Sequence, residues 1–229
     1  MQRFPAMSFI GVDDIDGFVP YCSIPPDLLA TIQKGIKRQR YREVRFLKSP
    51  LDVSIYLKLL ERERFETIIE IGSLEGGSAL WFADQMKQLD LRPKVVMVDL
   101  QPSLITGDYF LQVIADANSL DQSDLSKLLD ECPHPWLVVE DSSHYASTSL
   151  AVLNYFDSKL HPNDWIVIED GIISFMEGKL EADRDGGPML AIVEFLRRCG
   201  DRYLIDRELC DMYGENATWS PNGFLRRVG

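Results

Sequence analysis

The sequence has few of the residues that carry thiol or imidazole chemistry. It contains four cysteines and three histidines in 229 residues, and no two cysteines stand in a C-x-x-C spacing. This absence excludes a thioredoxin-like redox motif and the common cysteine zinc sites. We expect all four cysteines to be reduced, buried, apolar side chains of an intracellular protein: Cys22, Cys132, Cys199 and Cys210.

Clustered positive charge and long apolar runs are also scarce. The formal net charge is −12, whereas a nucleic-acid groove needs clustered Lys and Arg. The basic run at residues 34–45 is short, and we interpret it as a solvated helix face. No stretch approaches the roughly 18 apolar residues of a membrane span, and Pro5 with nearby aspartates interrupts any signal-peptide core. The sequence predicts a cytoplasmic protein with no nucleic-acid or membrane partner.

Two glycine motifs for phosphate binding, G-x-G-x-x-G and Gly-Lys-Ser/Thr, are missing too. The chain has instead TIIEIGSLEGGSA at residues 67–79, where β-branched residues run into Gly72 and a Gly76–Gly77 pair precedes a helical pattern beginning at Ser78. Glycine lacks a Cβ, so such a turn lets backbone N–H groups and a helix start approach a polar or anionic ligand. The same turn is also found where a strand is merely connected to a helix.

Short apolar segments alternate with helical patterns from residue 66 onward. This alternation is typical of a parallel sheet with helices on both faces. The predicted strands are Thr67–Ile71, Lys94–Leu100, Phe110–Ala115, Trp136–Glu140, Trp165–Glu169, Arg202–Arg207 and Gly223–Arg227. Between them we expect helices at Ala79–Leu89, Ser123–Leu129, Ser147–Leu160 and Gly187–Arg198. The predicted fold class is therefore α/β, with a doubly wound, mostly parallel seven-stranded sheet.

The first third of the chain is predicted to form an arm and a helical cap. Residues 1–25 are punctuated by proline and aspartate and are expected to pack on the body or on a second subunit. A helix opens at Pro26, residues 42–50 form a loop, and Pro50 begins a helix that ends near Glu63. The predicted domains are 1–65 for the arm and cap, and 66–229 for the α/β domain.

Ligands of doubly wound sheets lie beyond the carboxyl ends of the strands, so the strand ends are informative. Asp99 ends the second strand, where an acid commonly holds a ribose diol. The third strand runs into Asp116 and Ala117, followed by polar residues suited to an adenine edge. Each acid also suits a helix cap or a turn.

The fourth and fifth strands end alike, in Glu140–Asp141 and Glu169–Asp170. Carboxylates concentrated at one sheet edge are costly unless a cation neutralises them, and hard divalent ions prefer carboxylate oxygens. The alternative is that the acids separately cap the two following helices. His144 stands three residues after Asp141 and is a candidate general base. The remaining two histidines, each followed by proline, are interpreted as structural: His134 and His161.

Several of these motifs together resemble the cephalosporin hydroxylase and rhamnosyl O-methyltransferase family of class I S-adenosylmethionine (SAM)-dependent methyltransferases. The likeness rests on EIGSLEGGSA, Asp99, EDSSHYAST and VIEDGI, with a similar lead-in, YREVRFLKSPLDVSIY, and a similar ending, PNGFLRRV. It covers roughly residues 40–229. The resemblance implies a Rossmann-like methyltransferase domain behind the cap. It also implies a cofactor site that holds methionine, ribose and adenine in turn: Glu70, Gly72, Ser78, Asp99, Asp116 and Ala117.

The resemblance further implies a divalent ion, usually magnesium, held by Asp141, Glu169 and Asp170. His144 stands where catechol-type relatives carry a catalytic lysine, and it would take the proton. The primary hypothesis is methyl transfer from SAM to a hydroxyl of a sugar, phenol or other natural-product alcohol. The acidic composition favours a neutral or cationic acceptor, and specificity is expected from the cap and from residues 171–187, with Phe175 and Met176 as apolar contacts.

Two alternatives stay open from the sequence. One is a non-catalytic nucleoside-binding or scaffold protein. The other is a non-haem-iron hydroxylase, a chemistry that usually needs two histidines and one carboxylate. The aromatic N-terminal arm suggests a homo-oligomer, and the sequence names neither the acceptor nor its modified hydroxyl.

Overall fold

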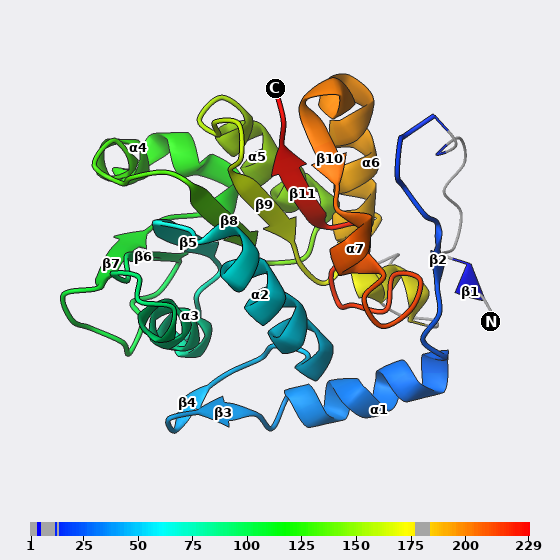
Figure 1. The fold of residues 1–229 in the computed structure, drawn as a ribbon, viewed down its shortest axis with the longest axis horizontal. Coiled ribbons are helices and arrows are strands. Elements are labelled where there is room, and N and C mark those ends of the chain that lie inside the picture. Colours follow the sequence, from blue (N-terminus) through cyan, green and yellow to red (C-terminus); the bar gives the residue numbers. More distant parts are fainter. Residues whose placement is uncertain (1–3, 6–11, 13, 177–183) are drawn as a thin grey trace.

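The structure is a computed structural model that describes residues 4–5, 12, 14–176 and 184–229. Seven strands form one sheet in the order β10-β11-β9-β8-β5-β6-β7 (Figure 1). The parallel strands are β5 (Thr67–Ile71), β6 (Val95–Asp99), β7 (Phe110–Ile114), β8 (Trp136–Glu140) and β9 (Trp165–Ile168). At one edge, β11 (Phe224–Arg227) runs antiparallel to β9, and β10 (Tyr203–Ile205) runs antiparallel to β11. The predicted sheet is confirmed.

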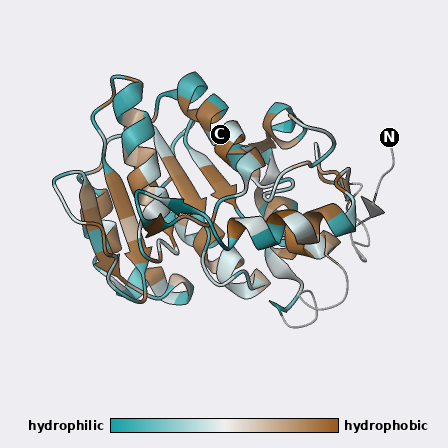
Figure 2. Cartoon of the chain, turned by 90° about the horizontal axis from the view of Figure 1, so that it is seen from below, coloured by the Kyte–Doolittle hydropathy of each residue, from teal (hydrophilic) through white to brown (hydrophobic). Residues whose placement is uncertain are grey.

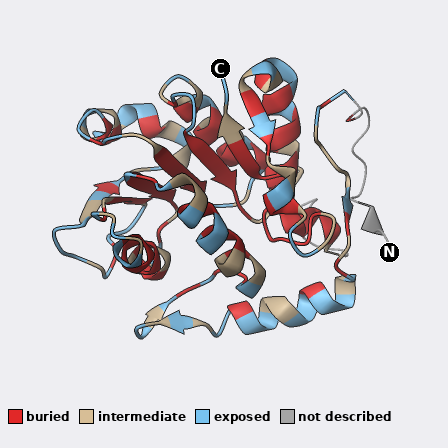
Figure 3. Ribbon diagram, viewed as in Figure 1, coloured by how far each residue is buried: buried red, intermediate tan, exposed pale blue. Residues whose placement is uncertain are grey.

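The central strands are buried on both faces. Every residue of β5 and β8 is buried. Strands between two helical layers need apolar side chains at consecutive rather than alternate positions, which explains the unbroken apolar runs in the sequence. Figure 2 shows these apolar strands between the helices, and Figure 3 shows that they are buried. Two acids interrupt the pattern near the carboxyl ends, Glu70 and Glu140, and both are fully buried.

Helices cover both faces of the sheet (Figure 1), with α2 beside α3 and α5 beside α6. The helix α2 begins as predicted, because Pro50 occupies its first turn and the Ser49 hydroxyl accepts the Asp52 N–H at 3.2 Å. The α-helices after the cap helix are α2 (Pro50–Glu63), α3 (Gly77–Gln88), α4 (Leu125–Leu129), α5 (Ala146–Asp157), α6 (Gly187–Cys199) and α7 (Arg207–Cys210). Short 3-10 helices are η1 (Ala117–Gln122), η2 (Gly171–Phe175) and η4 (Gly200–Arg202).

The segment before α2 differs from its prediction. The cap helix α1 (Pro26–Ile36) is followed by a hairpin of β3 (Arg40–Tyr41) and β4 (Val44–Arg45), where a loop and a solvated helix face are expected. Both turn residues, Arg42 and Glu43, have positive φ, as tight two-residue hairpins require. The basic run is therefore divided between a helix end and a hairpin.

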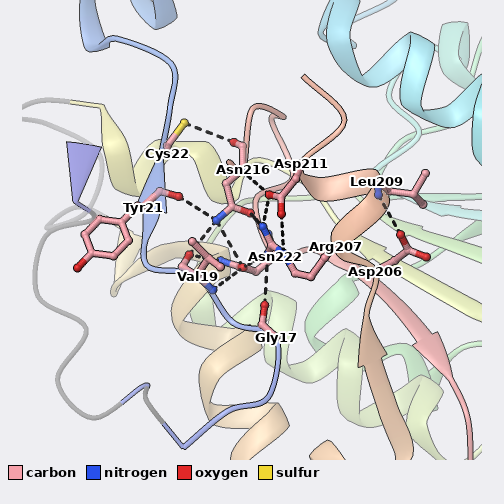
Figure 4. A network of polar contacts seen from close by, with 10 residues as sticks. All are labelled: Gly17, Val19, Tyr21, Cys22, Asp206, Arg207, Leu209, Asp211, Asn216 and Asn222. Atoms are coloured by element: carbon pink, nitrogen blue, oxygen red, sulfur yellow. Dashed lines mark hydrogen bonds and ion pairs between the residues drawn. The ribbon is translucent and has the colours of Figure 1, made fainter. Parts of the chain in front are cut away.

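The N-terminal arm is held by the loop between α7 and β11 (Figure 4). The amide of Asn216 donates to the carbonyls of Val19 and Tyr21 at 2.8 and 2.9 Å. Asn222 donates to the Val19 carbonyl at 2.9 Å and accepts the Val19 N–H at 3.0 Å, while Arg207 donates to Asn222 Oδ1 at 2.7 Å. The arm, which includes β1 (Phe4–Pro5) and β2 (Tyr21–Cys22), therefore packs in part on the body of its own chain.

A group that we call the amino-end cluster, His134, His161 and Asp164, lies at the amino ends of β8 and β9. The fully buried Asp164 carboxylate accepts the N–H groups of Trp136 and His161 at 2.7 and 2.6 Å and lies 2.7 Å from His134 Nδ1. The His134 ring stacks on both Trp136 and His161, with ring centroids 3.9 Å apart in each pair. These contacts give the two histidines the structural role that the sequence predicts.

The four cysteines are free and buried, as expected. Burial raises the pKa of the Cys22 thiol to about 11 and that of Cys210 to about 12, so both stay protonated near neutrality. Over the part of the chain that the structure describes, no helix is long and apolar enough to cross a membrane.

Candidate functional site

A cavity of about 550 Å³ lies at the carboxyl ends of β5, β6, β7 and β8. Most of the residues that the sequence predicts for the site line it together: Gly72, Ser78, Asp99, Asp116, Ala117, Asp141, His144 and Asp170. Glu70 and Glu169 are buried and do not belong to the lining. The rule that ligands lie beyond the carboxyl ends of the strands thus locates the cavity, whereas these two acids lie behind its lining.

The glycine turn after β5 allows two close backbone approaches. Gly72 has a φ of 92°, and a Cβ there would collide with the carbonyl oxygen of Asp141 after β8. A Cβ on Gly77 would collide with the Arg45 carbonyl in the hairpin. The helix α3 starts at this point without a side-chain cap, so its first N–H groups are suited to a polar ligand in the cavity.

The acids after β6 and β7 line the cavity and also shape their own turns. Asp99 accepts the N–H groups of Leu74 and Gln101 at 2.8 and 3.2 Å, one on each carboxylate oxygen. Asp116 accepts the backbone and side-chain N–H groups of Asn118, both at 2.9 Å, and caps η1. These hydrogen bonds lower the pKa of Asp116. Each carboxylate oxygen has a second lone pair, so a turn bond does not prevent ligand binding.

A second group, which we call the carboxyl-end cluster, consists of Asp141, His144 and Asp170. Its ligand atoms lie within 4.8 Å of one another, and His144 Nε2 lies 3.1 Å from Asp170 Oδ2. His144 and Asp170 have φ values of 61° and 55°, a left-handed conformation that costs a non-glycine residue on the order of 1 kcal/mol. Two residues in this conformation that contact each other on a cavity lining are typical of a functional site.

Lys48 is the cavity residue that sequence reasoning missed. It precedes α2, and its side chain is 2% exposed. Its Nζ lies 2.6 Å from Asp141 Oδ2, 2.8 Å from Glu169 Oε1 and 3.4 Å from Glu70 Oε1. Burial alone would lower the pKa of this lysine, but the three carboxylates raise it well above its usual value. The cap therefore places a protonated lysine among the acids. In the sequence, this residue is the lysine of the KSPLD segment, just before the predicted helix.

The two residues of each acidic pair, Glu140–Asp141 and Glu169–Asp170, have different partners. Glu169 accepts the Tyr56 hydroxyl at 2.6 Å on the same oxygen that contacts Lys48. Glu140 turns away from the cavity and accepts the Ser149 hydroxyl at 2.9 Å. Alternate strand residues point to opposite faces, so only the residue that follows β8, Asp141, enters the cluster from that strand.

Burial and mutual repulsion shift the acids toward their neutral forms. Burial, opposed by Lys48 and reinforced by Asp170, raises the pKa of Asp141 to about 6. Burial also raises the pKa of Glu169 to about 7, with Lys48 opposing it and Asp141 adding to it. Beneath them, burial raises the pKa of Asp52 to about 8. One lysine is thus insufficient to keep these acids fully ionised, and a further cation would relieve the repulsion.

The cap forms the wall opposite the glycine turn. Gln33 and Lys37 come from α1, and Trp219 comes from the loop before β11. The Trp219 indole donates to Gln33 Oε1 at 2.8 Å. Phe175 does not line the cavity as predicted, because it is buried against an apolar cluster that includes Trp219, and Met176 packs on the same cluster. Residues 177–183 of the predicted specificity loop lie outside the described residues.

Comparison with known proteins finds one family model over most of the chain. The model for rhamnosyl O-methyltransferase/CmcI matches residues 33–228. A curated rhamnosyl O-methyltransferase of Mycobacterium leprae is 30% identical over 191 residues, which cover 80% of this chain and 81% of the relative.

Solved structures of CmcI have the same fold. An apo structure of CmcI superposes with a TM-score of 0.65 at 26% identity and covers 84% of this chain and 77% of that chain. A CmcI structure with Mg and SAM superposes with a TM-score of 0.66 at 23% identity over 94% of this chain and 82% of that chain. Because the sequence identity to this second structure is only 23%, the similarity to it concerns the fold alone.

Proposed function

The chain belongs to the rhamnosyl O-methyltransferase/CmcI family, and from that membership we propose that it is a SAM-dependent O-methyltransferase. It would transfer the SAM methyl group to a hydroxyl of a small-molecule acceptor with the help of a divalent ion, preferably magnesium. The observation that carries the proposal is the cavity in which the glycine turn, Asp99 and the carboxyl-end cluster meet. The residues proposed for the cofactor, the metal and the base therefore line one cavity or lie directly behind it.

The residues present fit SAM. The fully buried Glu70 carboxylate shares Lys48, 3.4 Å from its Oε1, with two other acids, so it keeps acceptor capacity for a positively charged group just behind the glycine turn. Gly72 and Ser78 would cradle the methionine end beside it. Asp99 would take the ribose hydroxyls, and Asp116 with Ala117 would border the adenine. The chain would thus hold the cofactor along the ends of β5, β6 and β7.

The residues also fit a divalent ion. Asp141 and Asp170 offer carboxylate oxygens, which magnesium prefers, and burial, reinforced by repulsion from neighbouring acids, raises the pKa of both. Glu169 would contribute from behind, through the oxygen that Lys48 and Tyr56 leave open. A bound ion would lower the pKa of the acceptor hydroxyl and fix its oxygen beside the methyl group.

His144 would take the acceptor proton. Its Nε2 faces Asp170, and its buried Nδ1 has no hydrogen-bond partner among the described residues. If Nε2–H donates to Asp170, Nδ1 carries the lone pair that a general base needs. Asp170 would then fix the tautomer of His144, and SAM, when bound, would supply the methyl group to the deprotonated oxygen and leave as S-adenosylhomocysteine.

A sugar hydroxyl is the proposed acceptor class, since the curated relatives are named rhamnosyl O-methyltransferases. The cap wall supports it, because Trp219 offers an aromatic face and Gln33 and Lys37 offer polar groups. The cavity lining has four acids, Asp99, Asp116, Asp141 and Asp170, beside the three cations Lys37, Arg45 and Lys48, so it keeps the acidic balance of the chain.

The test is a calorimetric titration of metal-stripped protein with S-adenosylhomocysteine, before and after magnesium is added. We expect nucleoside binding and a separate magnesium heat, and we expect the magnesium heat to vanish in an Asp141→Ala, Asp170→Ala double variant. Methyl transfer to L-rhamnosides would then be followed by mass spectrometry. Absence of nucleoside binding under all conditions would overturn the cofactor assignment; nucleoside binding without any turnover would favour a non-catalytic protein.

The hydroxylase alternative finds no support in the site. Over residues 14–176 and 184–229, the imidazole that lies with the cavity acids is that of His144. The two-histidine, one-carboxylate group of the molecule is the amino-end cluster, at the opposite ends of the strands, where Asp164 already accepts backbone hydrogen bonds.

A further inference from the structure

Lys48 contacts one of the two carboxylate oxygens of each neighbouring acid, and this bears on metal selectivity. Its ammonium lies 2.6 Å from Asp141 Oδ2 and 2.8 Å from Glu169 Oε1. The Tyr56 hydroxyl donates to that same Glu169 Oε1 at 2.6 Å. The contacts with Lys48 and Tyr56 thus fall on one oxygen of each carboxylate, Oδ2 of Asp141 and Oε1 of Glu169.

The position of Lys48 is fixed rather than fluctuating. The side chain is 2% exposed, and a third carboxylate, Glu70, lies 3.4 Å from its Nζ at full burial. The backbone of Lys48 is held by the adjacent start of α2, where Ser49 caps the helix. Because the Lys48 side chain is almost wholly buried and three carboxylates surround its ammonium, removing it from either acid would be costly.

We propose that Lys48 is a positioning residue that restricts Asp141 and Glu169 to one available oxygen each and so selects a small six-coordinate ion over calcium. The inference rests on the metal site of the proposed function. Magnesium accepts single carboxylate oxygens in octahedral geometry and keeps several waters, whereas calcium takes six to eight oxygens and often binds carboxylates through both. A lysine that occupies the second oxygen removes the bidentate mode.

The experiment measures metal affinity without turnover. Binding of Mn²⁺ to the protein with S-adenosylhomocysteine is followed by electron paramagnetic resonance, and Mg²⁺ or Ca²⁺ is added to displace it. For the wild type we expect Mg²⁺ to displace Mn²⁺ at lower concentration than Ca²⁺. For Lys48→Met we expect the ratio of the two displacing concentrations to move toward Ca²⁺ by about tenfold or more, the scale of effects from residues that orient metal ligands.

Two variants complete the design. Tyr56→Phe releases the same Glu169 oxygen from one of its two partners, so the ratio should move in the same direction by a smaller factor. Lys94→Met is the matched control: the Lys94 ammonium donates to the Glu131 carbonyl far from the cavity, and its ratio should equal that of the wild type. Circular dichroism melts establish that each variant is folded.

The outcomes separate this inference from the proposed function. A ratio that is unchanged in Lys48→Met, while both proteins bind Mn²⁺, overturns the inference alone. If Lys48→Met does not fold, an unchanged ratio in Tyr56→Phe has the same meaning. Absence of Mn²⁺ binding to the wild type overturns both the metal site and this inference, while retained binding of S-adenosylhomocysteine leaves the cofactor assignment standing.

Discussion

The two ends of the same pair of strands carry similar residues in opposite circumstances. The amino-end cluster and the carboxyl-end cluster each combine imidazole with carboxylate around β8 and β9, and each brings its ligand atoms within 4.8 Å of one another. At the amino end, Asp164 accepts two backbone N–H groups and lies beside His134. At the carboxyl end, His144 and Asp170 adopt left-handed backbone and border a cavity.

The difference lies in hydrogen-bond satisfaction, not in residue type. Buried polar groups are normally paired, and a group left unpaired is an exception that asks for an explanation. The amino-end acid uses both oxygens within the protein. At the carboxyl end, the buried His144 Nδ1 has no hydrogen-bond partner among the described residues, and the buried Glu70 carboxylate shares Lys48, 3.4 Å from its Oε1, with two other acids. A cluster whose polar atoms are all hydrogen-bonded stabilises the fold, whereas a cluster with unpaired polar atoms beside a cavity can bind a ligand.

The largest expected effect is on catalysis at the carboxyl end. Asp170→Asn replaces a proposed carboxylate ligand, which also faces His144, by a neutral amide, so methyl-transfer turnover should fall on the order of 10³-fold. The melting temperature of the metal-free protein should not fall, because burial raises the pKa of Asp170 and the substitution removes a disfavoured charge. Turnover by mass spectrometry and thermal melts measure the two quantities. A large loss of stability would mean that Asp170, like Asp164, stabilises the fold.

The next effect is on stability at the amino end. Asp164→Ala leaves the N–H groups of Trp136 and His161 without their acceptor in a buried site. The free energy of unfolding should fall by about 3 kcal/mol, measured by urea denaturation. Affinity of the folded fraction for S-adenosylhomocysteine should stay within twofold or so of wild type. A specific loss of nucleoside affinity would contradict the separation of the two ends.

A smaller catalytic effect is expected from the base. His144→Gln should lower kcat about 10²-fold, the lower end for loss of a general base, while Mn²⁺ affinity changes little. The matched control is His161→Gln at the amino end, which should leave kcat unchanged. If His144→Gln instead abolishes Mn²⁺ binding, the imidazole is a metal ligand and not the base.

The smallest effect is the pH dependence of metal-free stability, and its sign differs between the two ends. Burial raises the pKa of Asp141 to about 6 and that of Glu169 to about 7, above their usual values of 3.8 and 4.5. The stability that their protonated forms provide is fully present near pH 4 and is lost as pH rises through about 7. Burial lowers the pKa of His134 below 6.5, so the amino end loses stability as pH falls below that value.

Variants separate these two contributions. Melting temperatures in chelator across pH 4 to 8 should decline less steeply on the alkaline side for Asp141→Asn, and less steeply on the acid side for His134→Gln. Equal slopes in Asp141→Asn and wild type would mean that the pKa of Asp141 is not raised in the folded protein.

Much of this comparison could be predicted from local sequence. The bounds of β5 and β8 match the prediction residue for residue, because fully buried parallel strands have unbroken apolar runs that end at a glycine or an acid. The strand-end rule then brings Asp99, Asp141 and Asp170 to one cavity. The interpretation of His134 as structural also agrees with its contacts.

The rest depends on contacts between distant segments. Lys48 reaches Asp141 across 93 positions of sequence, and no periodicity or motif spacing encodes that approach. The burial of Phe175 depends likewise on a cluster with Trp219, which comes from a distant segment of the sequence. The β3–β4 hairpin was hidden by its charged composition, since two-residue strands leave no pattern to detect. The predicted division at residue 65 and the predicted homo-oligomer stay predictions.

The wall that carries Trp219 also has a consequence for how the protein is made. The Trp219 backbone donates to the buried Asp52 carboxylate at 3.1 Å, and its indole reaches Gln33 of α1. The arm near Val19 is fastened by Asn216 and Asn222 (Figure 4). The arm, α1 and Asp52 are thus held by a segment that is synthesised only after β9, so a nascent chain that ends at β9 lacks the contacts that fasten this side of the cavity.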